Sequence, residues 1–268
     1  MAILNGDELS GLIGPIVIRR RKDGTAIVQS RAKSYTQSPK SKKNTKMFGY
    51  GSTVACHIRV QLSGSILFYD PQMINRFNNP VKEVLKHCFN KKEKLFTLER
   101  DSFKRLADFE FNTKSPLVNF LWVKPEMVLE DNTLKVTIPE FKNGSQFIFP
   151  SGTNTCEVTI TITQINISQT LTSHELTNSF EINANQESYP AREIVFDVAN
   201  GSLCVAAIGL TYYKRTDDIR VLYNSKLFSP ANVIGALIVP GVYIQPPIPP
   251  TSNKGYSKEW VDAYKLRF

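Results

Sequence analysis

The strongest constraint on the fold is an alternating run in the middle of the chain, CEVTITITQINI at residues 156–167. Val158, Ile160 and Ile162 alternate there with threonines. Side chains that alternate in this way point to opposite faces of a β-strand. We therefore predict a half-buried strand, with its apolar face on a core and its threonine face toward solvent.

Further runs of β-branched and aromatic residues surround this strand. They read TLKVTIPEF, QFIFP, REIVFDVA and LCVAAIGLTYYKR. Clusters typical of turns separate them: Glu130-Asp131-Asn132, Lys142-Asn143-Gly144 and Asn200-Gly201. Short strands spaced by turns indicate an antiparallel sandwich. We predict an α+β, mostly β protein whose residues 95–245 form an immunoglobulin-like β-sandwich.

Two segments before this region have a helical period. In the first, the apolar or small residues Met47, Gly51, Val54, Ala55, Ile58 and Leu62 share one helical face. The second follows Asp70-Pro71, which we interpret as a helix N-cap and first helical residue. Asn79-Pro80 then restarts it, and Val81, Val84, Leu85 and Cys88 share a face. Residues 46–94 are therefore predicted to form a small helical layer.

The N-terminus is predicted to be a basic hairpin arm over residues 1–45. Two β-branched runs, Ile16–Ile18 and Ala26–Val28, flank an Asp-Gly pair, which is a strong hairpin signal. The stretch SRAKSYTQSPKSKKNTK that follows is polar, and we interpret it as an extended connector. At the other end, residues 246–268 form a Pro-rich tail that finishes with aromatic and basic residues.

The net charge is concentrated near the N-terminus. Residues 19–46 contain ten Lys or Arg and one acid, Asp23, so this segment alone accounts for the formal net charge of +9. Clustered bases of this kind are candidates for binding phosphate groups. The candidates are Arg19, Arg20, Arg21, Lys22, Arg31, Lys33, Lys40, Lys42, Lys43 and Lys46. Tyr35 is the only aromatic residue among them, so no platform for stacking bases is visible.

Cysteine and histidine give no metal site or cofactor site. Cys56-His57 and His87-Cys88 look like a mirrored ligand set, but adjacent residues on a helix point about 100° apart. We expect Cys56 and Cys88 to pack in the helical layer instead. With three histidines in the chain and no GxSxG, GxGxxG or GxxxxGK[ST] motif, we predict a protein that is not an enzyme.

Cys156 and Cys204 lie on predicted strands, where an immunoglobulin-type disulfide would sit. Trp122 precedes both cysteines rather than lying between them, and the N-terminus has no basic leader but carries Asp7 and Glu8. We therefore expect buried thiols. Without a signal peptide or transmembrane span, we expect a cytoplasmic protein or one released by a non-classical route, with no membrane insertion.

The N-terminal region resembles a family of uncharacterised proteins common in Bacteroidota. The resemblance is carried by GLIGPIVIRRRKDGTAIVQSRAKSYTQSPKS and the following MFGYGSTVACHIR, with shorter matches in ADFEFNTKSPL (107–117) and YNSKLFSPA (223–231). It is strongest over residues 11–62. It implies an order of hairpin, helix and β-rich half, and it brings no activity, cofactor or catalytic residue.

Three functions remain open at this point. We favour a non-enzymatic structural protein that self-assembles into a homo-oligomeric filament, tube or shell through its arm, because an unpaired hairpin edge recruits strands. The expected contact residues are Ile16, Ile18, Ile27, Val28, Trp260, Tyr264 and Phe268. A nucleic-acid-associated coat or packaging protein that uses the basic arm is the alternative. A monomeric sandwich-type binding module is the third.

Overall fold

The computed structural model describes residues 2–6, 8–21, 23–31, 36, 38–93, 95–167, 171–217, 219–243 and 260–262 of the 268. The chain divides into two compact units, Met1–Asn44 and Thr45–Phe268. Strand makes up 44% and helix 20%, so the protein is mostly β. The predicted α+β class, with an N-terminal hairpin sheet, a pair of helices and a C-terminal antiparallel sheet, is confirmed.

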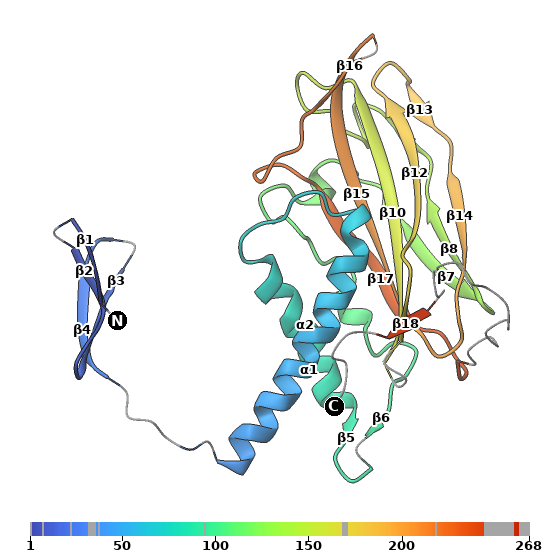
Figure 1. Cartoon of the computed structure of the whole chain (residues 1–268). Helices are drawn as coiled ribbons and strands as arrows, with labels where there is room; N and C mark the ends of the chain where they lie inside the picture. Colours follow the sequence, from blue (N-terminus) through green and yellow to red (C-terminus); the bar gives the residue numbers. More distant parts are fainter. Residues whose placement is uncertain are drawn as a thin grey trace, which may run out of the picture. The chain divides into compact units, whose positions relative to one another are not determined.

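The first unit contains a four-stranded antiparallel sheet (Figure 1). Its strands follow chain order: β1 (Ala2–Asn5), β2 (Glu8–Ile13), β3 (Ile16–Arg20) and β4 (Ala26–Ser30). The predicted hairpin is the β3–β4 pair, and Gly24 supplies the positive φ of its turn, 84°. Asp23 Oδ1 accepts the Thr25 N–H at 2.9 Å in the same turn. Strands β1 and β2 were not predicted, because glycines interrupt their short apolar runs.

The first helix, α1 (Pro39–Gln61), begins earlier than the sequence indicated. We expected an extended connector up to residue 45, whereas the lysine-rich stretch from Pro39 is helical. Ser38 Oγ accepts the Ser41 N–H at 3.2 Å, and Pro39 occupies the first turn, where its missing N–H has no cost. Lysine favours helices but has no apolar period to reveal one.

Two helices of the second unit place their apolar faces as predicted. In α1, Val54, Ala55 and Ile58 are fully buried, and the short helix η1 (Leu62–Gly64) continues this face. Helix α2 (Met73–Cys88) runs through Pro80 without the expected restart. Asp70 is not its N-cap, since Asp70 Oδ1 accepts the Gln72 N–H at 2.9 Å in the turn before the helix.

A seven-stranded antiparallel sheet forms the centre of the second unit. Its two middle strands are β10 (Thr155–Asn166) and β15 (Leu203–Thr216), which pair along most of their length. The outer strands are β17 (Ala231–Ile238), β16 (Ile219–Leu222), β12 (Leu176–Asn183), β11 (Leu171–Ser173) and β18 (Trp260–Asp262). A second sheet consists of β7 (Glu126–Glu130), β8 (Thr133–Ile138) and β14 (Arg192–Asp197).

Short elements complete this unit. They are β5 (Phe89–Asn90) with β6 (Leu95–Phe96), β9 (Phe141–Lys142) with β13 (Ser188–Tyr189), and the helices η2 (Lys104–Leu106) and η3 (Leu117–Asn119). The β7–β8 hairpin turns at Asp131, whose φ is 50°, as the Glu130-Asp131-Asn132 cluster predicted.

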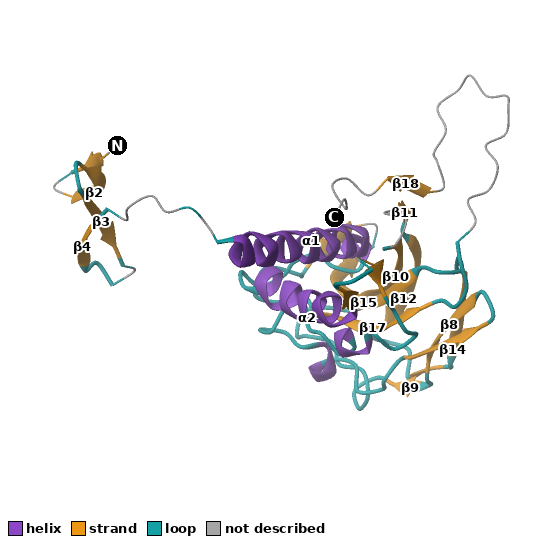
Figure 2. Cartoon of the chain, turned by 90° about the horizontal axis from the view of Figure 1, so that it is seen from below, coloured by secondary structure: helices purple, strands orange, loops and turns teal. Residues whose placement is uncertain are grey.

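The helices cover one face of the seven-stranded sheet and the three-stranded sheet covers the other (Figures 1 and 2). A hydrophobic core lies at each face. On one face, Val205 and Ala207 pack with Ile58 and the rest of the helical layer. On the other face, Ile160 packs with Val136 and the rest of the three-stranded sheet. The unit is therefore layered as helices, large sheet and small sheet.

The threonine face of β10 differs from the prediction. We expected it to face solvent, but Thr161 and Thr163 are fully buried under the end of α1. Ser65 Oγ lies 2.9 Å from Thr161 Oγ1, and Thr163 donates to Gln61 Oε1. A threonine row can be buried because these facing polar groups satisfy its hydroxyls.

Gly209 on β15 allows the helical layer to approach this closely. A Cβ added at Gly209 would lie 1.9 Å from the carbonyl oxygen of Ser65. No side chain fits at that distance, so the contact between η1 and the sheet depends on this glycine.

Candidate functional site

The N-terminal sheet has one strongly apolar face. Directly opposed residues of neighbouring strands share a face, and here Leu4 opposes Leu9, Ile13 opposes Ile16, and Ile18 opposes Val28. We call this set of six the arm face. Of the predicted contact residues, Ile16, Ile18 and Val28 belong to it. Ile27 does not, because it opposes Arg19 on the other face of the sheet.

The arm face is not covered within its unit. Leu4 is 68% exposed and Val28 63% exposed. No described side chain among residues 2–44 is buried. The opposite face is more polar, since Ser10, Arg19 and Gln29 interrupt it. A sheet normally buries its apolar face against a second layer. The arm face is therefore suited to packing against another apolar surface.

The predicted phosphate-binding residues lie on two kinds of element. Arg19 and Arg20 end strand β3, and Arg21 and Arg31 lie just beyond β3 and β4. Four lysines lie instead in the first two turns of α1: Lys40, Lys42, Lys43 and Lys46. Lys22 and Lys33 fall outside the described residues. The bases are thus divided between a hairpin and a helix N-terminus.

The tail residues are only partly described. Trp260 begins strand β18, whose backbone pairs with β11 of the same chain. This backbone pairing does not test whether Trp260 also contacts a neighbouring copy, so that expectation stays a prediction. Tyr264 and Phe268 lie outside the described residues.

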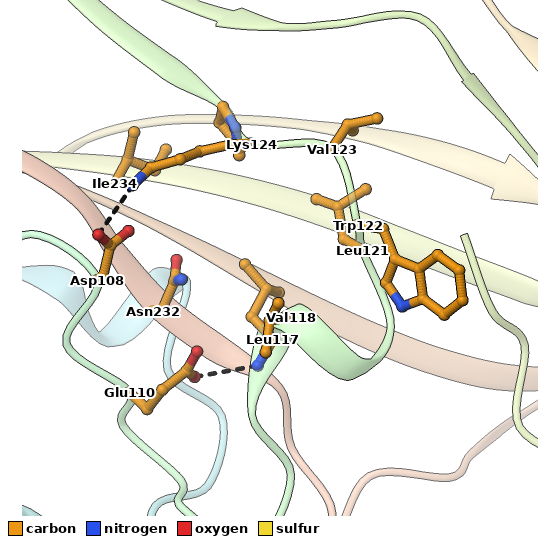
Figure 3. A pocket seen from close by; sticks show the side chains of 11 residues that line it. Asp108, Glu110, Leu117, Val118, Leu121, Trp122, Val123, Lys124, Asn232 and Ile234 are labelled. Atoms are coloured by element: carbon orange, nitrogen blue, oxygen red, sulfur yellow. Dashed lines mark hydrogen bonds and ion pairs between the residues drawn. The ribbon is translucent and has the colours of Figure 1, made fainter. Parts of the chain in front are cut away.

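A pocket of about 390 Å³ lies on the second unit, between the segment after η2 and the loop that contains η3 (Figure 3). We call it the Glu110 pocket. It is lined by Asp108, Glu110, Leu117, Val118, Leu121, Trp122, Val123, Lys124, Pro125, Asn232 and Ile234.

The two acids of this pocket alternate with phenylalanines in the sequence. In the run Asp108-Phe109-Glu110-Phe111, the two phenylalanines pack into the helical core. Phe77 lies 5.0 Å from Phe109 and 5.9 Å from Phe111, measured between ring centroids. Asp108 lies in a turn with a φ of 61°, and Glu110 follows it, so that both carboxylates line the pocket (Figure 3).

Hydrogen bonds hold the two carboxylates in different ways. Glu110 Oε2 accepts the Leu117 N–H at 3.0 Å, whereas Asp108 Oδ2 pairs with Lys124 Nζ at 2.8 Å. Burial raises the pKa of Glu110 from 4.5 to about 7, against hydrogen bonds from Leu117 and Asn232 that lower it. Glu110 is therefore partly protonated near neutral pH, while Asp108 is in an exposed ion pair.

The sequence analysis missed this pocket. The signal that could have found it is the strict acid–phenylalanine alternation at 108–111. Burial of the two phenylalanines would leave the two acids for another side of the segment, but the positive φ of Asp108, 61°, shows that alternation alone does not set their direction. Nothing in the sequence connects them with Asn232 or Lys124, which only the fold brings near.

The cysteines are all free thiols, as expected for Cys156 and Cys204. Cys156 opposes Tyr212 and Cys204 opposes Gln164, so the two lie about 25 Å apart along the paired strands. Cys56 is exposed, contrary to our expectation that it packs in the helical layer. Cys88 does pack against the helical core. Among the described residues no group of three or more His, Cys, Asp or Glu could hold a metal ion.

No protein-family model matches the chain, and neither a curated protein nor a solved structure matches it. The resemblance to Bacteroidota proteins therefore stays a prediction. No helix in the described part of the chain is both long enough and apolar enough to cross a membrane.

Proposed function

We propose that the chain is a non-enzymatic structural protein that assembles with copies of itself through its N-terminal arm, into a filament, tube or shell. One observation carries this proposal. The arm face is apolar, and no described residue of its unit is buried.

The physical argument concerns what such a sheet needs. Covering an exposed Ile, Leu or Val side chain contributes roughly 1.5–3 kcal/mol, and four of the six residues of the arm face are exposed: Leu4, Ile13, Ile16 and Val28. A second copy supplies an equal sheet, so that two arm faces can pack on each other. Strands β1 and β4 are also the outer strands of the sheet, and such edges can pair with strands of a neighbour.

Removing the arm tests the proposal. We choose a deletion of residues 1–37, because Ser38 caps α1 and should be kept. The second unit has its own two cores, so the truncated protein should melt cooperatively and remain a monomer. Sedimentation of both proteins over a range of concentrations provides the measurement. A full-length chain that stays monomeric throughout would contradict the proposal and favour a monomeric sandwich-type binding module.

Two point variants test whether the arm face itself forms the interface, which the deletion of residues 1–37 alone does not show. Val28→Lys places a charge on the arm face, and an unpaired charge that is buried in an interface costs several kcal/mol. Gln29→Lys adds the same charge at the next residue, on the opposite face. We expect Val28→Lys to abolish assembly and Gln29→Lys to leave it nearly intact. Equal effects of the two variants would mean that charge alone, and not the arm face, controls assembly.

Nucleic-acid binding is a second candidate, favoured by a different observation. The first two turns of α1 carry four lysines, and its first turn has no acid. Positive charge at the positive end of a helix dipole is unfavourable, so a bound phosphate would stabilise this end. Nucleic acid that co-purifies, and binding at physiological salt that is lost when Lys40, Lys42, Lys43 and Lys46 are changed to Gln, would support it. Binding that vanishes at that salt would leave assembly as the better function.

A further inference from the structure

The Glu110 pocket has two walls of opposite character (Figure 3). Asp108, Glu110 and Asn232 form a polar wall with carboxylate and amide oxygens. Leu117, Val118 and Leu121 form an apolar wall. A ligand for such a pocket needs hydrogen-bond donors on one side and hydrocarbon on the other.

In the polar wall, no described basic side chain is paired with the Glu110 carboxylate. The nearby Arg76 donates from Nη2 to the backbone carbonyl of Glu110 at 2.9 Å. Lys124 pairs with Asp108, but both side chains are more than 60% exposed. Such an exposed pair is weak and exchanges readily for another cation.

The apolar wall suits the stem of a long basic side chain. Arg and Lys bury their methylene groups along apolar surface while the charged end finds polar partners. At the rim, Val118 is 61% and Trp122 62% exposed. An exposed tryptophan next to a pocket is typical of the anchoring residues in protein interfaces, and its ring can attract a cation.

The chain itself carries a matching segment. Arg19, Arg20 and Arg21 are consecutive and directly follow the apolar residues of β3. The segment 19–46 holds all of the net positive charge. We propose that the Glu110 pocket receives an arginine of Arg19–Arg21 from a second copy of the chain. This inference rests on the assembly function proposed above and adds to it a contact between the arginines of the arm and the second unit of another copy.

The size of the pocket limits how the arm can enter. A volume of about 390 Å³ is near the lower end for small-ligand pockets, so it holds one arginine side chain and not a strand. The arginine would donate to Glu110 and displace Lys124 from Asp108. Arginine is suited to this role because its planar guanidinium donates two parallel hydrogen bonds to a carboxylate.

A peptide experiment tests the inference. The probe is a synthetic peptide of residues 14–31, added to the protein that lacks residues 1–37 and carries Trp260→Phe, so that Trp122 is the only tryptophan. We expect saturable quenching or a spectral shift of Trp122, and weaker binding at high salt. A peptide with glutamine at positions 19, 20 and 21 should bind at least tenfold more weakly, since each charge-assisted hydrogen bond is strong.

Variants of the pocket provide the control. Glu110→Gln should weaken binding roughly tenfold or more, whereas Glu187→Gln removes an exposed charge elsewhere and should have no effect. Binding should also tighten from pH 6 to pH 8, as the Glu110 carboxyl ionises beside Asp108, Arg76 and Lys124. Binding unaffected by Glu110→Gln would overturn the inference. So would arginine amide that binds as tightly as the peptide, because the pocket would then take a small cation.

The inference and the proposed function can fail separately. If full-length Glu110→Gln protein still assembles like the wild type, the pocket is not the receptor, although the arm can still be the joint. If the wild-type chain never assembles, the assembly function fails whatever the peptide does.

Discussion

Strand β10 in the second unit and strand β4 in the first contain similar residues but differ in burial. Every residue of β10 except Glu157 is buried. No residue of β4 is buried, and Val28 is 63% exposed. Both strands contain Ile and Val in a short β-branched run. The difference comes from the layers around them, since β10 lies between helices and a second sheet and β4 lies in a single-layered sheet.

This contrast shows that a β-branched run specifies a strand but does not specify which other layer, if any, packs on that strand. In the second unit the cover is supplied by the same chain. In the first unit no described residue is buried, so the sheet does not cover its own apolar face. Substitutions should therefore have large effects on the melting of the second unit and small effects in the arm, and the following four predictions test this difference.

The largest effect is expected for Gly209→Ala. The added Cβ would lie 1.9 Å from Ser65 O, a backbone atom that cannot rotate away. We expect a loss of about 3 kcal/mol or more in the free energy of unfolding, measured by urea denaturation. Gly49→Ala is the matched control, because nothing lies within 4 Å of its Cβ. In this helical position it should stabilise by roughly 0.5–1 kcal/mol.

A smaller loss is expected for Gln61→Leu. Gln61 accepts from Thr163 and donates to Thr172 and to the Ser173 carbonyl in the buried polar layer. Leucine leaves the Thr163 hydroxyl without this partner, at a cost of about 2 kcal/mol. The double variant Gln61→Leu, Thr163→Val should regain part of the loss. If the double variant loses as much free energy of unfolding as the two single variants together, these two groups do not interact.

A pH-dependent effect is expected at Glu110. Its pKa is raised to about 7 in the folded chain, above the 4.5 of an unperturbed group. The folded state thus binds this proton more tightly, so the stability it contributes is full below pH 4.5 and is lost as pH rises through 7. Glu110→Gln should equal the wild type near pH 4 and exceed it by about 1 kcal/mol at pH 8, after allowance for partial exposure.

Thermal or urea unfolding at the two pH values provides the measurement. Glu187→Gln is the control and should show no such crossover. A Glu110→Gln protein that is less stable than the wild type at pH 8 would mean that the charged carboxylate, and not the neutral acid, is the form that the fold favours.

The smallest effect is expected for Val28→Ala in the arm. Ile160→Val, which removes one methylene group from a fully buried side chain, should cost about 1 kcal/mol. Val28→Ala removes more hydrocarbon, but it should change the melting of the second unit by less than about 0.5 kcal/mol when the protein is dilute. A comparable loss for both would show that the arm belongs to the cooperative core.

Local patterns predicted the elements that depend on neighbouring residues. Helical period found the buried face of α1, including Val54 and Ile58. The Asp23-Gly24 pair found the β3–β4 hairpin, because Gly24 tolerates the positive φ of that turn. Such signals are contained within a few residues and need no knowledge of the fold.

What escaped prediction depends on residues far apart in the chain. The threonine face of β10 is buried because Gln61 and Ser65, about 100 residues earlier, satisfy its hydroxyls. The same holds for the candidate site, since Glu110 and Asn232 are brought together by an antiparallel bridge between Glu110 and strand β17, which contains Asn232. Charge and alternation mark such residues as unusual but do not say what faces them.

The topology of the N-terminal sheet also sets an order of events during synthesis. All of its pairings join neighbouring strands within residues 2–30, and hairpins of this kind form in about 1–10 μs. The β10–β15 pairing needs the chain as far as Tyr213. At ribosomal rates, those roughly 180 further residues take about 10–40 s. All strands of the arm are thus available for pairing well before the larger unit of the same chain is complete.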